Sequence, residues 1–117
     1  MTPDARPVPA GPSGGAVGEW LAGREASPPP ELRERVSALA RGGAILDAPV
    51  PQSLLSAAAA ALERLARSGA SDRATALDLL AVDALVTYAF EAAAESPGSI
   101  PVLSAGAMAR LSAAAAA

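Results

Sequence analysis

Four polar side chains recur every four residues within one apolar stretch of the chain: Asp83, Thr87, Glu91 and Glu95. On a helix this spacing places them along one stripe, with steps of about 6 Å. Like charges in such a row repel one another, and Glu91 and Glu95 also face the negative end of the helix dipole. Local energetics therefore oppose the stripe, so it requires an explanation.

Three interpretations of this acidic stripe stay open. It is a solvated helix face, or it pairs with Arg33, Arg35 or Arg110 of the same chain, or it binds a basic partner. The third interpretation makes Asp83, Thr87, Glu91 and Glu95 partner-binding residues.

The chain lacks the side chains that most catalytic sites use, since it contains no histidine and no cysteine. Serine and cysteine nucleophiles need an imidazole base, and carboxylate-bridged di-iron bundles need Glu-x-x-His pairs. Neither glycine pair is followed by the lysine of a phosphate loop. We expect no enzyme activity, no cofactor and no metal; an enzyme or ligand-binding role would need a polar pocket in which Asp and Arg converge.

The charge balance of the chain indicates which classes of partner it can bind. Nine basic residues, all arginine, and 12 acidic ones give a net charge of -3. A nucleic-acid binder needs a clustered basic face, and a membrane span needs about 20 consecutive apolar residues. We expect a cytoplasmic protein that binds neither nucleic acid nor membrane.

Trp20 is the single tryptophan and lies beside Leu21, close to a proline-rich N-terminal arm. Tryptophan is enriched among interface hot spots, so Trp20 is a candidate partner-binding residue. The alternative is that Trp20 folds back and covers a thin helical core.

These residues must be positioned by helices. Ser, Asp, Pro and Gly at the ends of apolar-periodic segments predict four helices, at about 29–41, 53–68, 71–95 and 100–112. The fold class is all-α, a small antiparallel bundle of about four helices, with residues 1–18 as a disordered Pro/Gly-rich arm and 19–117 as one domain. Residues 71–95 are apolar on more than one side, so we expect this helix to be enclosed by the others. In the connection that precedes the helix at 53–68, Pro49 and Pro51 argue against a regular helix. Ile45, Leu46 and Val50 of this connection are expected to pack on the bundle.

Residues Ala76 to Glu95, ALDLLAVDALVTYAFEAAAE, resemble the helix of trans-polyprenyl diphosphate synthases that reads roughly Ala-Gly-Asp-Ala-Leu, an apolar half and Phe-Glu. The likeness covers 20 of 117 residues. It implies aspartate-rich Asp-Asp-x-x-Asp motifs that bind magnesium and diphosphate, and none occurs here. At most it indicates a degenerate isoprenoid-synthase-like helical fragment.

Because alanine supplies much of the apolar fraction, the helices form readily but bury little area each. We therefore expect a non-enzymatic helical interaction or structural module that self-associates or binds a protein partner. The alternative is a small acidic regulatory protein that binds a basic surface of a transcription or enzyme partner.

Overall fold

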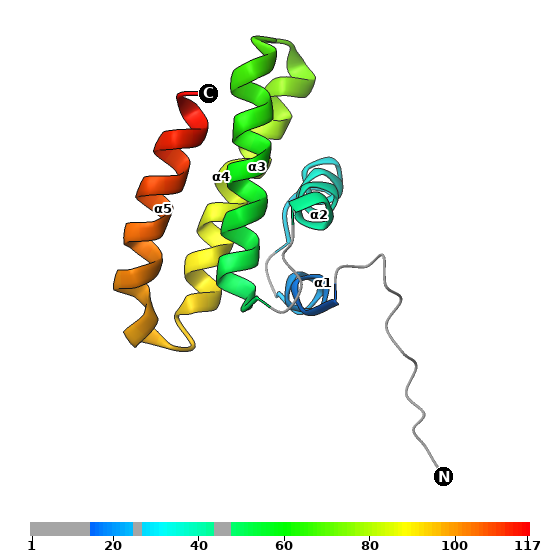
Figure 1. Cartoon of the computed structure of the whole chain (residues 1–117). Helices are drawn as coiled ribbons and strands as arrows, with labels where there is room; N and C mark the ends of the chain where they lie inside the picture. Colours follow the sequence, from blue (N-terminus) through cyan, green and yellow to red (C-terminus); the bar gives the residue numbers. More distant parts are fainter. Residues whose placement is uncertain (1–14, 25–26, 44–47) are drawn as a thin grey trace.

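The computed structural model describes residues 15–24, 27–43 and 48–117, and the regular secondary structure of these residues is entirely helical (Figure 1). Five α-helices and one 3₁₀ helix follow one another in this part of the chain: α1 Gly15–Ala22, α2 Pro30–Gly43, α3 Val50–Ser68, α4 Arg73–Ala93, η2 Pro97–Ser99 and α5 Ile100–Ala115. The prediction of an all-α protein is confirmed.

The helices form two groups. In Figure 1, α3, α4 and α5 run side by side and the chain direction alternates between them, whereas α1 and α2 are seen end-on and cross this group. Helix α3 contacts all four other α-helices. The expected antiparallel bundle of four helices is thus replaced by three antiparallel helices with two crossing ones.

Helix α3 is the central element. Every residue from Ser53 to Ala61 except Ala60 is buried, and half of these buried residues are alanines. Alanine projects only a methyl group, so neighbouring helices approach α3 closely from several sides. The expectation that α4 would be enclosed by the others is wrong in its first turns, because Leu79 and Leu80 are 47% and 56% exposed.

The end of α2 packs tightly against α3. A Cβ atom added at Gly43 would lie 2.5 Å from the Cα of Ala57 and 3.1 Å from its Cβ, whereas one added at Gly42 would meet nothing within 4 Å. Glycine at position 43 therefore allows the backbones of α2 and α3 to touch.

Local signals place the helix ends close to their predicted positions. Helix α3 ends at Gly69, which adopts the left-handed conformation with φ of 65°, and the Asp72 side chain caps α4. The start of α3 differs from the prediction. The helix begins at Val50 with Pro51 in its first turn, where the missing N–H has no helical partner to lose.

The predicted boundary at residue 18 also differs from the structure. Residues 15–18 belong to α1, and Val17 is buried in the core. The disorder predicted for residues 1–14 and the packing predicted for Ile45 and Leu46 lie outside the described residues. Among the helices described, none is long and apolar enough to cross a membrane.

Candidate functional site

The acidic stripe lies on the solvent side of α4. Asp83, Thr87 and Glu91 are exposed, and Glu95 is exposed in the turn two residues after the helix ends. Within the described part of the chain, Asp83 and Glu95 make no ion pair. Two carboxylates of the stripe are thus free, as both the solvated-face and the partner interpretations require.

Glu91 is held by an arginine that the sequence analysis did not consider. Its carboxylate accepts a hydrogen bond from Arg24, in the segment after α1. Arg35, one of the three expected partners, instead pairs with Asp78. Asp78 lies about 140° around the helix from Asp83, at 100° per residue, so α2 meets a different side of α4 from the stripe.

Arg24 also joins the two aromatic rings of the site. Its guanidinium carbon lies 3.9 Å from the centroid of the Tyr88 ring and 5.3 Å from that of Trp20. The two ring centroids are 6.0 Å apart with an interplanar angle of 53°. Cation–π attraction and the Glu91 carboxylate therefore fix the guanidinium from different directions.

Trp20 is half-buried and packs against the core, as the interpretation that it covers the thin helical core requires. Its role in partner binding stays a prediction. Sequence reasoning missed Arg24. The available signal was its spacing of four residues from Trp20, which is the spacing of neighbours on one helix face.

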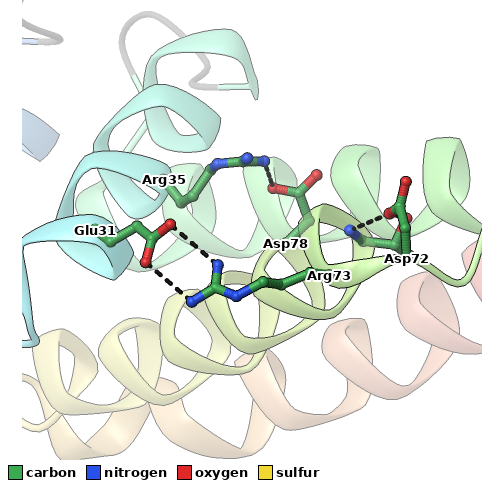
Figure 2. A network of polar contacts seen from close by, with 6 residues as sticks. Glu31, Arg35, Asp72, Arg73 and Asp78 are labelled. Carbon is green, nitrogen blue, oxygen red and sulfur yellow. Dashed lines mark hydrogen bonds and ion pairs between the residues drawn. The ribbon is translucent and has the colours of Figure 1, made fainter.

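Two further ion pairs hold α2 against the first turns of α4 (Figure 2). Two guanidinium nitrogens of Arg73 donate to the carboxylate oxygens of Glu31, at 3.1 and 3.3 Å. Arg35 pairs with Asp78 one helical turn further along α2. Both pairs join α2 to α4, so these charges have structural roles.

The Asp72 carboxylate caps α4, close to the predicted start of the helix at residue 71. It accepts hydrogen bonds from the backbone N–H and the hydroxyl of Thr75, at 2.9 and 2.8 Å. These two hydrogen bonds hold the pKa of Asp72 below its ordinary value.

In comparisons with protein-family models, curated proteins and solved structures, nothing matches this chain. The geometry of its surfaces alone therefore has to indicate a function.

Two surfaces stand out from the rest. A pocket between α1 and α2 is lined by Arg24, Arg33 and Arg41, and among residues 15–24, 27–43 and 48–117 no acidic side chain lines it. Helix α5 lies on the other side of the molecule from α1 and α2 (Figure 1). It exposes Val102 and Met108. The convergence of Asp and Arg that would indicate catalysis is not found in this pocket, and no three acidic side chains of the described residues gather where they could hold a metal ion.

Proposed function

We propose that this protein is a non-enzymatic helical interaction module that self-associates through the outer face of α5. The observation that carries the proposal is the exposure of two large apolar side chains on this helix, Val102 at 74% and Met108 at 72%. Val102 and Met108 lie about 120° apart around α5, at 100° per residue, so they flank its outer face from two sides. Monomeric soluble proteins rarely expose a wide apolar patch.

The whole outer face of α5 is uncharged. Leu103, Ala107 and Ala114 are buried on the inner side. The opposite side consists of exposed small or apolar residues: Val102, Ala105, Met108, Ala109, Ser112 and Ala113. The one charge in α5 is Arg110, which lies about 80° around the helix from Val102, at 100° per residue.

A second copy of the chain fits this face better than an oppositely charged partner. Two identical uncharged faces meet without like-charge repulsion, although the chain has a net charge of -3. Alanine at positions 105, 109 and 113 lets two α5 helices approach closely in a two-fold symmetric pair. A helix of 16 residues is only about 24 Å long, so we expect a small interface and reversible association.

Sedimentation velocity over a range of concentrations tests the proposal. The wild-type protein is expected to dimerise with increasing concentration, and Met108→Glu to remain monomeric with an unchanged melting temperature. The matched control is Leu80→Glu, which places the same charge at an exposed leucine of α4 and should leave dimerisation unchanged. A wild-type monomer at all concentrations, or a Met108→Glu dimer, would contradict the proposal.

The second candidate is the acidic regulatory protein that binds a basic partner surface. The exposure of Asp83, Thr87 and Glu95 favours it, while Glu91 is already engaged by Arg24. Charge reversal at Asp83 and Glu95 should abolish such binding and leave self-association intact. For either function we propose a cytoplasmic location, and the isoprenoid-synthase-like fragment stays an expectation from sequence alone.

A further inference from the structure

The pocket between α1 and α2 has the size and the walls of a small-molecule site. Its volume is about 290 Å³, and Tyr88 of α4 completes the lining. Apolar side chains contribute much of the wall: Val17 and Leu21 from α1, and Val36 and Ala40 from α2. Small-molecule sites typically combine such apolar walls with a few polar groups.

The charged side chains that line this pocket in the described part of the chain are all cationic. Three of the nine basic residues of an acidic protein line it. Arg33 donates only to the Ser27 hydroxyl, at 3.2 Å, and Arg41 makes no hydrogen bond or ion pair in the described part of the chain. Two of the three positive charges are therefore uncompensated, so the pocket favours an anion.

Arg24 supplies the third cation and an unused donor. Its Nε atom is buried and has no hydrogen-bond partner among the described residues, although a terminal nitrogen of the same guanidinium is bound by Glu91. A buried donor without an acceptor destabilises the folded protein. Because protein atoms cover this nitrogen, a ligand in the pocket would be bound by the exposed guanidinium groups of Arg33 and Arg41.

We propose that this pocket binds an amphiphilic carboxylate, a molecule with one carboxylate group and an apolar body. Guanidinium groups bind carboxylates through paired hydrogen bonds, and the walls formed by Val17, Leu21 and Val36 receive the apolar body. A cavity of about 150 Å³ holds benzene, so a pocket of about twice that volume holds about a dozen non-hydrogen atoms. An inorganic anion would leave the apolar walls unfilled.

Decanoate is a suitable probe, because it has a carboxylate and about that number of atoms. The full chain is titrated with decanoate, decan-1-ol and inorganic phosphate while tryptophan fluorescence is recorded. Trp20 is the single tryptophan and lies beside Arg24, so its emission reports on this site. We expect a saturable change with decanoate, at least about tenfold weaker binding of decan-1-ol, and no response to phosphate.

Charge-removing variants locate the site. Arg33→Gln with Arg41→Gln should weaken decanoate binding at least about fivefold and leave the melting temperature within a few degrees of wild type. The matched control is Arg64→Gln, an exposed arginine of α3 that does not line the pocket, and it should bind decanoate as the wild type does. The proposal is overturned if decan-1-ol binds as tightly as decanoate, if phosphate alone binds, if no probe gives a saturable response, or if the double variant retains full affinity.

Discussion

The contact between the end of α2 and α3 gives the sharpest test of the fold, because two adjacent glycines differ only in what surrounds them. At Gly43 an added methyl group would lie 2.5 Å from the Cα of Ala57, and at Gly42 it would meet no atom within 4 Å. Alanine at either position gains the same helix propensity. The difference in stability between Gly42→Ala and Gly43→Ala therefore isolates the cost of separating the two helices.

The magnitude follows from the geometry. Carbon atoms in contact prefer a separation of about 3.5 to 4.0 Å, so the end of α2 must move by about 1 Å to accept the methyl group. Overpacking of this kind costs about 1 to 3 kcal/mol. In a domain of this size that cost lowers the melting temperature of Gly43→Ala by about 4 to 20 °C relative to Gly42→Ala.

Thermal unfolding followed by circular dichroism at 222 nm measures the difference directly. Gly42→Ala should melt at or above the wild-type temperature, and Gly43→Ala below it. Equal melting temperatures for the two variants would refute the close approach of α2 to α3.

Three further outcomes are expected. Leu54→Ala, at a fully buried position of α3, should destabilise the protein by about 2 to 5 kcal/mol in urea unfolding, and Leu79→Ala, at a half-exposed position of α4, by clearly less. Because the folded-state pKa of Asp72 is lowered, the stability that its carboxylate contributes is present above pH 4 and lost as the pH falls through the folded-state pKa. The melting temperatures of wild type and Asp72→Ala should therefore converge in acid. A difference in melting temperature that does not change with pH would contradict the capping role of the carboxylate. Glu31→Gln should lower the melting temperature slightly at low salt and leave it unchanged at high salt, since the Glu31 pair with Arg73 is solvent-exposed.

The helix boundaries were predictable because they depend on neighbouring residues. Proline in the first turn of α2, glycine after α3 and Asp72 before α4 are local signals, and each marks a helix end within a few residues. The central position of α3 was not predictable in the same way. Hydrophobic patterns give most weight to large side chains, whereas the burial of an alanine depends on how closely other helices approach it.

The candidate site shows the same division between local and distant information. The spacing of Asp83, Thr87 and Glu91 predicts a shared face, and these residues do share one. The pairing of Glu91 with Arg24 spans 67 residues and depends on how α1 crosses α4, which no local pattern specifies. The side of α5 that faces α3 was likewise not specified by any local pattern.

The methyl groups that surround α3 carry a consequence for how this protein tolerates sequence change. Alanine has no side-chain rotamers, so the seams between α3 and its neighbours cannot adjust by rotation about side-chain bonds, as leucine-rich seams do. Exchanges that enlarge a residue, such as Ala58→Val, should consequently be tolerated less well than exchanges for serine or glycine. The central helix, with its small buried side chains, would then be the one with the narrowest choice of amino acids.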